Sequence, residues 1–334
     1  MTGANPIACT VPLDAPGVHH GQLRLPYSRD DSAWGSVLTP ITVIGGAVPG
    51  PTVLVTGGNH GDEYEGPLAV LEAAATLRAD AVRGRVILVP FLNAAAVRAG
   101  RRTSPIDGAN MNRIFPGRPD GTPSQKIADY MARVLIPMAD VVLDFHSGGK
   151  TLDFLPFAAG HLLPDKAQEA ACMAAVRAFG APYAMQMLEI DAVGMLDTEV
   201  EAQGKVFVTT ELGGGGTARA ETVRIARRGL RNLLIHAGVL EGAPEAVDSA
   251  MLDMPDADCF VFAGDAGMLD PVADLGDRVT AGQVIARIWP LDRTGAAPVD
   301  YRAGRAGLLT ARHFPGLVQA GDCLAVVAVE VGQG

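Results

Sequence analysis

Four continuous apolar runs stand out in the first two thirds of the chain. One is Val53–Thr56, and the others lie in RVILVPFLN, ADVVLDFHSGG and KVFVTTELGGGG. Runs of this kind are typical of strands that are buried on both faces of a sheet. Segments with helical periodicity lie between them, in LAVLEAAATLRA and over residues 124–138, 165–179 and 222–237. The alternation predicts an α/β fold with a mainly parallel sheet and flanking helices.

The composition changes near residues 241–258, where the chain is acidic and rich in small residues, as in a linker. Beyond it, DAGMLDPVADLGDRVTAGQVIARI and RAGLLTARHFPGLVQAGDCLAVVA repeat one pattern at a spacing of roughly 40 residues. We therefore predict two domains, an α/β domain over residues 1–245 and a β-rich C-terminal module over residues 246–334. The module resembles lipoyl and biotinyl hammerheads. However, it lacks the Met-Lys hairpin of those carriers, which disfavours a carrier function.

Composition excludes several classes of partner. The net charge is −10 and aromatic residues make up only 5%, which argues against nucleic acids and anionic membranes. No apolar run is long enough to span a bilayer, and the first residues show no signal-peptide pattern. The four cysteines have no paired spacing and are interpreted as reduced thiols. We therefore expect a cytoplasmic protein that acts on a small molecule.

Polar side chains follow three of the four apolar runs. His60 and Glu63 come after the first, His146 ends the third, and Glu211 ends the fourth. Ligands of open α/β sheets bind outside the carboxyl ends of the strands, so we expect these side chains to converge. Two imidazoles and one carboxylate form a ligand set of catalytic zinc, which leaves a position open for water. The sequence thus predicts that His60, Glu63 and His146 bind one Zn²⁺ per chain.

Glu211 is then the predicted general base, which takes a proton from the attacking water and returns it to the leaving amine. Asp144 lies two residues before His146 and is a candidate hydrogen-bond partner of a ligand imidazole. A purely structural carboxylate is the alternative for Asp144. A lone His-x-x-Glu pair also occurs in solvated loops. It is the combination of all four residues at strand ends that favours a metal site. The other five histidines lack ligand spacing and are interpreted as structural.

A second polar cluster lies in a segment rich in glycine and proline, residues 101–117. A guanidinium group can bind a carboxylate through two parallel hydrogen bonds. We expect Asn112 and Arg113 to bind a substrate carboxylate. Arg102 could polarise the scissile carbonyl, although Arg101 competes for this role. Surface salt bridges are the alternative for these arginines.

Together these motifs resemble the succinylglutamate desuccinylase/aspartoacylase family of zinc amidohydrolases, whose fold is carboxypeptidase-like. The matches are G-N-H-G-D-E (His60, Glu63), D-F-H (His146), N-R-x-F (Asn112, Arg113) and T-E-[LVI]-G (Glu211). The resemblance implies hydrolysis of the amide of an N-acyl amino acid. The family often has D-L-N-R, whereas this chain has Asn110 at the first position, so no carboxylate there can orient the arginine.

Longer stretches, such as TSPIDGANMNRIFPGRPDG and DFHSGGKTLDFLPFAA, resemble a deacetylase subgroup that acts on N-alpha-acetyl-L-2,4-diaminobutyrate in ectoine degradation. This substrate keeps a cationic amine and needs an acidic or polar pocket wall, whereas acylated acidic amino acids need a basic one. The segment MLEIDAVGMLDTEVEAQGK carries five carboxylates, and it has no lysine or arginine before Lys205. It could line the pocket or be a solvated loop.

Three alternatives stay open at this stage. One keeps the chemistry but changes the substrate, as in a desuccinylase, an aspartoacylase or a carboxypeptidase. Another is a non-catalytic binding protein that uses the C-terminal module, which an intact set of ligands and base argues against. The module could also close the substrate pocket or form a subunit interface, and in the second case the protein would be a homo-oligomer.

Overall fold

The structure is a computed structural model that describes residues 6–332. Its helices are α1 (Glu65–Thr76), α2 (Ala94–Ala99), α3 (Pro123–Tyr130), α4 (Ile136–Met138), α5 (Lys166–Phe179), α6 (Leu196–Ala202) and α7 (Ala220–His236). Short turns of other helix types are η1 (Ala79–Ala81), η2 (Met111–Arg113), η3 (Met131–Leu135) and η4 (Ala257–Cys259). The helices predicted over residues 165–179 and 222–237 correspond to α5 and α7. The segment 124–138 forms α3 and α4 with a π turn between them.

The strands of the first part are β1 (Ala8–Cys9), β2 (Gly17–Pro26), β3 (Ser36–Gly45), β4 (Val48–Thr56), β5 (Arg83–Val89), β6 (Val141–His146), β7 (Leu152–Phe154), β8 (Phe157–Gly160), β9 (Tyr183–Gln186) and β10 (Val206–Glu211). Those that follow are β11 (Ala250–Asp253), β12 (Phe260–Phe262), β13 (Gly267–Pro271), β14 (Arg278–Val279), β15 (Val284–Trp289), β16 (Val299–Arg302), β17 (Gly307–His313), β18 (Leu317–Val318) and β19 (Cys323–Glu330). The four apolar runs are β4, β5, β6 and β10, as predicted.

One large sheet runs through most of the molecule in the order β1-β2-β3-β5-β4-β6-β10-β8-β9-β11-β19-β17-β14. Its centre, β5-β4-β6-β10, is parallel, and so is the group β8-β9-β11. The other neighbours along this path are antiparallel. The expectation of a mainly parallel sheet is therefore corrected to a mixed sheet. β2 alternates between buried and exposed positions, a half-solvated antiparallel pattern that differs from a continuous apolar run.

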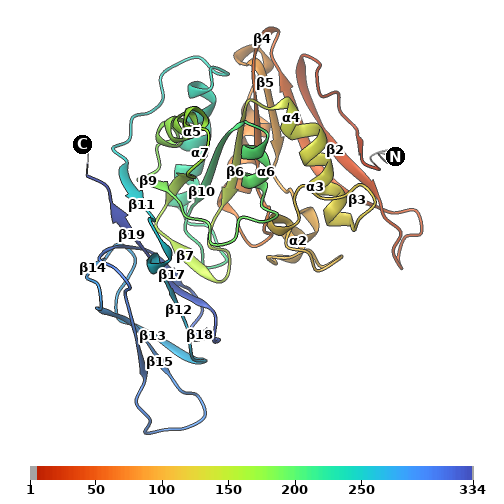
Figure 1. Ribbon diagram of the computed structural model, residues 1–334. Coiled ribbons are helices and arrows are strands. Elements are labelled where there is room, and N and C mark those ends of the chain that lie inside the picture. The colour runs from red at the N-terminus through yellow and green to blue at the C-terminus, as the bar shows by residue number, and fades with distance from the viewer. Residues whose placement is uncertain (1–5, 333–334) are drawn as a thin grey trace.

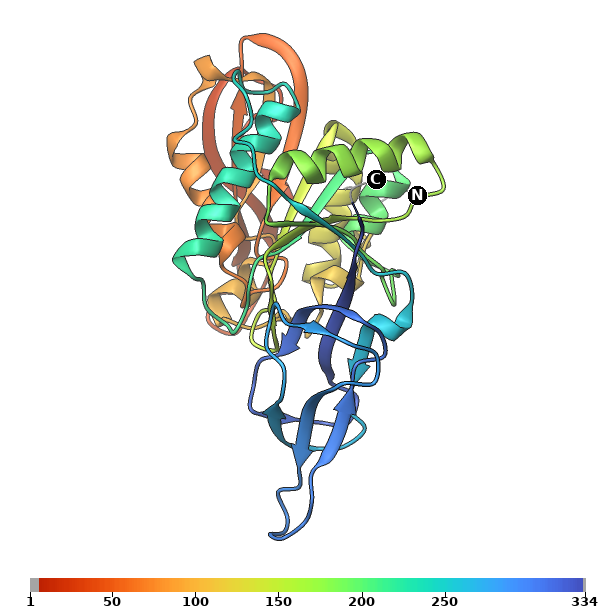
Figure 2. The ribbon, with the colours of Figure 1, turned by 90° about the vertical axis from the view of Figure 1, so that its left-hand side faces the viewer.

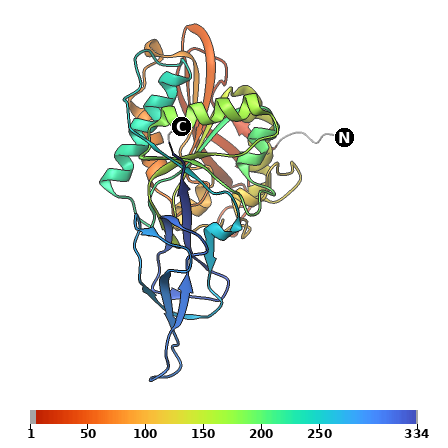
Figure 3. The ribbon, with the colours of Figure 1, turned by 60° about the vertical axis from the view of Figure 1, so that its left-hand side comes forward.

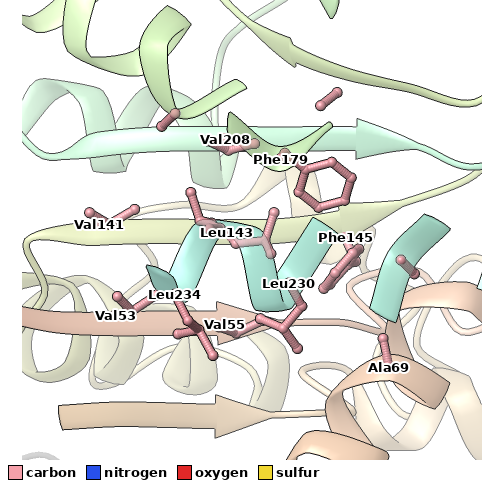
Figure 4. Packing of buried hydrophobic residues seen from close by; sticks show 14 of the residues in the cluster. Val53, Val55, Ala69, Val141, Leu143, Phe145, Phe179, Val208, Leu230 and Leu234 are labelled. Carbon is pink, nitrogen blue, oxygen red and sulfur yellow. The ribbon is translucent and has the colours of Figure 1, made fainter. Parts of the chain in front are cut away.

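Helices cover both faces of the parallel centre (Figure 1). The odd-numbered residues of β4 and β6 pack against α1, α5 and α7. Figure 4 shows three of them, Val55, Leu143 and Phe145, next to Phe179 and Leu230. The rings of Phe145 and Phe179 meet edge to face, with their centroids 6.0 Å apart. The strands of this region are thus buried on both sides, which explains their unbroken apolar sequences.

The even-numbered residues of the same strands, such as Leu54 and Val142, belong to a second core with residues of α3 and α6. Gly66 near the start of α1 allows this helix to lie close to the sheet, because a Cβ there would come within 2.1 Å of the Phe145 Cβ. The two cores hold the central strands rigidly, so side chains at their carboxyl ends are fixed in position.

The C-terminal segment forms the blue module that extends from the α/β part (Figures 2 and 3). The predicted repeat is confirmed as two sets of three strands, β13-β14-β15 and β17-β18-β19. The short strand of each set pairs with a strand of the other set: β18 with β13, and β14 with β17. The module also continues the main sheet through β7–β17 and β11–β19 pairs.

All four cysteines are free, as expected. Within residues 6–332, no helix combines the length and the apolar character needed to cross a membrane.

Candidate metal centre and active site

The carboxyl ends of three neighbouring parallel strands bring the predicted site residues together. β6 lies between β4 and β10, with Thr56 opposite Asp144 and His146 opposite Glu211. The segment that follows β4 carries His60 and Glu63 back over this edge. Gly61 is needed in that segment, because a Cβ there would come within 2.0 Å of the Ala96 backbone. The convergence expected from the sequence is therefore confirmed.

The Glu63 carboxylate lies between the two imidazoles. Its Oε1 is 2.7 Å from Nδ1 of His60, and its Oε2 is 3.0 Å from Nδ1 of His146. One ligand atom from each of the three residues can be chosen so that all lie within 4.8 Å of one another. The three side chains are 2 to 9% exposed. This is a compact, buried set of two nitrogens and a carboxylate, as a catalytic metal site requires.

The far nitrogen of each imidazole is held by another side chain. Nε2 of His60 lies 3.0 Å from the Asn110 amide oxygen, and Nε2 of His146 lies 2.8 Å from Asp144. Because both partners accept hydrogen bonds, each Nε2 can hold its proton there, and each Nδ1 would then have a lone pair for a metal ion. Those lone pairs face the oxygens of Glu63, and a cation between them removes the repulsion. The residues therefore fit a divalent metal ion.

The predicted contact of Asp144 with a ligand imidazole is thus confirmed, and its carboxylate is itself held by Thr56 Oγ1 at 2.6 Å and Asn59 Nδ2 at 3.0 Å. The role of Asn110 was not predicted. The sequence shows only that an amide replaces a carboxylate, and the structure shows that this amide orients His60. It also accepts a hydrogen bond from the Asn112 backbone, which ties the arginine-containing loop to the metal ligands.

Glu211 ends β10 beside this centre. Its Oε2 is buried without a hydrogen-bond partner within residues 6–332. Burial, together with the negative charge of Glu63, raises the pKa of the Glu211 carboxyl to about 8. A carboxyl group that titrates near neutral pH is suited to accept and return a proton. Four glycines, residues 213–216, all with positive φ, turn the chain away directly afterwards.

The structure distinguishes the two neighbouring arginines. Arg102 lines the same pocket as Glu211 and lies 3.5 Å from Glu63, whereas Arg101 does not line it. Arg113 also lines the pocket and is exposed. Asn112 is buried, and its side-chain oxygen already accepts hydrogen bonds from Leu196 N and Asn59 Nδ2. Asn112 therefore fastens the start of α6 to the site, and only its amide nitrogen remains for a ligand.

The pocket in front of Glu211 has a volume of about 460 Å³. Phenylalanine and methionine side chains form much of its wall, and Arg102 and Arg113 are its only arginines within residues 6–332. Glu189, Asp191 and Asp197 line it as well. The acidic segment noted in the sequence thus contributes to the pocket wall, which decides between the two interpretations left open for it.

His161 was interpreted as structural, but the structure surrounds it with acidic groups. Its Nδ1 lies 2.8 Å from Glu201 and its Nε2 lies 3.5 Å from Glu189. Burial disfavours the charged imidazolium, yet these carboxylates raise the pKa of His161 to about 10. The carboxylates belong to the acidic segment already noted in the sequence, but no motif or spacing links that segment to His161.

His161 should make stability depend on pH above neutrality. Its pKa is higher in the folded chain than in the unfolded chain, so its contribution is complete below about pH 6.5 and is lost as the pH rises through 10. We expect the free energy of unfolding of His161→Gln to differ most from that of the parent below pH 6.5. The difference should shrink by up to about 1.4 kcal/mol per pH unit across this window. Denaturant unfolding of both proteins measures it, and a difference that stays constant from pH 6.5 to 10 would contradict the assignment.

Comparison with known proteins agrees with the site. Residues 49–237 match the model of the succinylglutamate desuccinylase/aspartoacylase catalytic domain. The chain belongs to this family. The N-alpha-acetyl-L-2,4-diaminobutyric acid deacetylase of Halomonas elongata is 55% identical over 97% of this chain and 95% of its own length.

Two solved members of the family are similar over nearly their whole length. The product-bound ectoine utilization protein EutE (DoeB) of Ruegeria pomeroyi has a TM-score of 0.96 and 61% identity, covering 98% of this chain and 99% of its own. A protein described as a succinylglutamate desuccinylase from Silicibacter sp. TM1040 has a TM-score of 0.95 and 60% identity, covering 98% and 100%. Two different activities are thus named among relatives of similar identity.

Proposed function

We propose that this chain is a metal-dependent deacetylase that hydrolyses N-alpha-acetyl-L-2,4-diaminobutyrate to acetate and diaminobutyrate in ectoine catabolism. The observation that carries the proposal is the buried set of His60, Glu63 and His146 with Glu211 beside it in one pocket. The 55% identity to a deacetylase over nearly the whole chain supports the substrate. We further propose that the enzyme acts in the cytoplasm, and that residues 1–245 form a catalytic domain of carboxypeptidase-like architecture, with residues 246–334 as its module.

His60, Glu63 and His146 would hold one Zn²⁺ per chain. When bound, the ion supplies Lewis-acid activation of water and of the amide carbonyl. Asn110 and Asp144 would hold the Nε2 protons, so that each Nδ1 lone pair could bind the ion.

Glu211 acts as the general base and then as the general acid. It takes one proton from the attacking water, which forms a bond to the amide carbon, and it delivers a proton to the nitrogen as the C–N bond breaks. The products are acetate and a free α-amine. Arg102, next to Glu63, stabilises negative charge on the carbonyl oxygen.

The α-carboxylate of the substrate is bound by Arg113, with the side-chain nitrogen of Asn112 as a second donor. This arrangement is supported by the exposed guanidinium at the pocket and by its hydrogen bond of 2.7 Å to the Asn112 carbonyl, which orients it. A guanidinium held in this way presents its remaining donors toward the pocket.

Arg113→Lys should weaken substrate binding, because an ammonium group cannot form the paired hydrogen bonds of a guanidinium. We expect KM for the acetylated substrate to rise on the order of 10-fold or more, with a smaller change in kcat. Steady-state kinetics measures both. Arg101→Lys is the matched control, since Arg101 is exposed and does not line the pocket. Equal kinetics in the two variants would remove Arg113 from the binding site.

Succinylglutamate desuccinylase activity is the second candidate, because a relative with 60% identity is described by that name. Such a substrate carries additional carboxylates, which the acidic wall formed by Glu189 and Asp197 disfavours. The direct test measures hydrolysis of acetyl-diaminobutyrate, succinylglutamate and acetylaspartate side by side with the metal-loaded enzyme. Faster turnover of either acidic substrate would overturn the proposed function.

A further inference from the structure

The pocket wall contains an acidic group that the proposed chemistry does not use. His161, Glu189 and Asp197 each contribute an atom to a group whose members lie within 4.8 Å of one another. Glu189 and Asp197 also line the catalytic pocket, and both line an adjoining cavity that His161 and Glu201 border. The group therefore lies in the wall between the two cavities, and two of its carboxylates are accessible to a bound substrate.

The charges of this group do not balance. One imidazole lies among the carboxylates of Glu189, Glu201 and Asp197. Even a fully charged imidazolium neutralises only one of the three. Burial, and to a smaller extent the charges of Glu189 and Glu201, raise the pKa of Asp197 to about 6 against the opposing effect of His161. A cation bound from the pocket would relieve this repulsion.

Among the described residues, the group also has unused hydrogen-bonding capacity, namely a donor on His161 and an acceptor on Asp197. Nε2 of His161, a residue only 7% exposed, has no hydrogen-bond partner within residues 6–332. A carboxylate oxygen of Glu189 lies 3.5 Å from this nitrogen, which is too distant for a good hydrogen bond. A small rotation of Glu189 would complete that bond and fix the carboxylate. The hydrogen bonds of Asp197 in the described part of the chain all use Oδ1, which leaves Oδ2 available.

We infer that Glu189 and Asp197 form a subsite for the terminal ammonium group of the substrate side chain, with His161 as the residue that positions Glu189. This inference rests on the proposed function and assigns the specificity within it. The subsite belongs to the same pocket as the catalytic base, and the charge of Glu189 reaches Glu211 electrostatically. A diamino acid that is deacetylated at its α-nitrogen can thus place its second amine at this wall. Methionine side chains, including Met187 and Met195, line the pocket and can pack against the intervening methylene groups.

A divalent metal ion is a different occupant for the same three residues. It is disfavoured because the pKa of His161 is raised to about 10 by the surrounding carboxylates, so a metal would have to displace a proton from this imidazole. An ammonium group has no such requirement. It needs only acceptor oxygens, which Glu189 and Asp197 supply.

The test compares N-alpha-acetyl-L-2,4-diaminobutyrate with N-alpha-acetyl-L-norvaline, in which a methyl group replaces the ammonium. For Glu189→Gln in the metal-loaded enzyme, kcat/KM for the first substrate should fall on the order of 10- to 100-fold, mainly through KM. For the norvaline compound, kcat/KM should stay within about threefold. Asp197→Asn should show the same pattern and covers the case in which Glu189→Gln does not fold. His161→Gln should do so more weakly, with KM rising and kcat retained.

The controls are Glu199→Gln, Asp191→Asn and the wild-type enzyme. Glu199→Gln changes a carboxylate of α6 that does not line the pocket, and it should leave both substrates unaffected. The subsite is wrong if Glu189→Gln and Asp197→Asn lose activity equally for both substrates, or lose none. It is also wrong if only Asp191→Asn, the second control, loses activity selectively for the diamino substrate. A second metal equivalent that disappears in Glu189→Gln would also overturn it. If the wild-type enzyme does not hydrolyse acetyl-diaminobutyrate at all, it is the proposed function that fails, which is a separate outcome.

Discussion

Replacing Glu211 by glutamine should reduce kcat on the order of 10²- to 10⁴-fold while the enzyme keeps its metal. Glutamine has nearly the same size but cannot accept the proton of the attacking water. The Oε2 atom of Glu211 has no hydrogen-bond partner within residues 6–332, so the substitution breaks no hydrogen bond of this atom. We therefore expect no loss of thermal stability.

The measurement combines steady-state kinetics, metal analysis and a melting curve on the same preparation. The metal content should match that of the parent, because Glu211 is not one of the three ligands. KM should change little, because Glu211 transfers protons in the transition state and its loss does not weaken binding of the substrate. A variant that retains activity within a few-fold of the parent would exclude Glu211 as the base, and a variant that lost its metal would make the assignment of ligands wrong.

The sequence predicted the central strands and the convergence of the site for the same reason. β4, β6 and β10 are buried on both faces, so their apolar runs are long, and a polar residue at the end of such a run is conspicuous. Parallel neighbours then bring those polar ends to one edge of the sheet. His60, His146 and Glu211 could be found in this way because local pattern and long-range geometry agree.

Other features depend on contacts that no local pattern encodes. β2 alternates between buried and exposed positions, a weaker signal than an apolar run. Its antiparallel pairing with β3 was therefore missed, and the sheet was expected to be more parallel than it is. Asn110 contacts His60 although 50 residues separate them in the sequence, and neither its residue type nor its spacing predicts that it orients this imidazole. His161 meets Glu189 and Glu201 only because β8, α6 and the segment after β9 are packed together.

These two kinds of feature have different consequences for the site. The proposed ligands and base would perform chemistry that many acylated amino acids could undergo, and they are the part that the motifs identify. The acidic wall, which we propose selects among those substrates, consists of residues of α6 and of the segment before it. Asn112 connects the two parts, because its side chain joins Asn59, near the metal ligands, to the start of α6 at Leu196. The motifs thus predicted the reaction type, and the fold was needed to place the acidic segment in the pocket wall.

His60→Ala should abolish both metal binding and hydrolysis, with a loss in kcat/KM larger than that caused by Glu211→Gln. Without this imidazole the site keeps only one carboxylate and one nitrogen, which is too few ligands to hold a divalent ion against water. Asn110 and Arg102 also lose their shared partner. Metal analysis after dialysis and hydrolysis assays with added Zn²⁺ measure the effect, and treatment of the parent with a chelator should reproduce it.

The matched control is His236→Ala, which removes an exposed histidine at the end of α7 and should leave metal content and activity unchanged. Reloading the chelated parent with Zn²⁺ should restore activity, whereas His60→Ala should stay inactive at the same concentration. A melting curve of His60→Ala that matches the curve of the chelated parent separates loss of the ion from loss of the fold. Full activity in metal-free parent enzyme would show that His60, Glu63 and His146 form a buried polar cluster with no part in hydrolysis, and the chemistry assigned to Glu211 would then need another source of activated water.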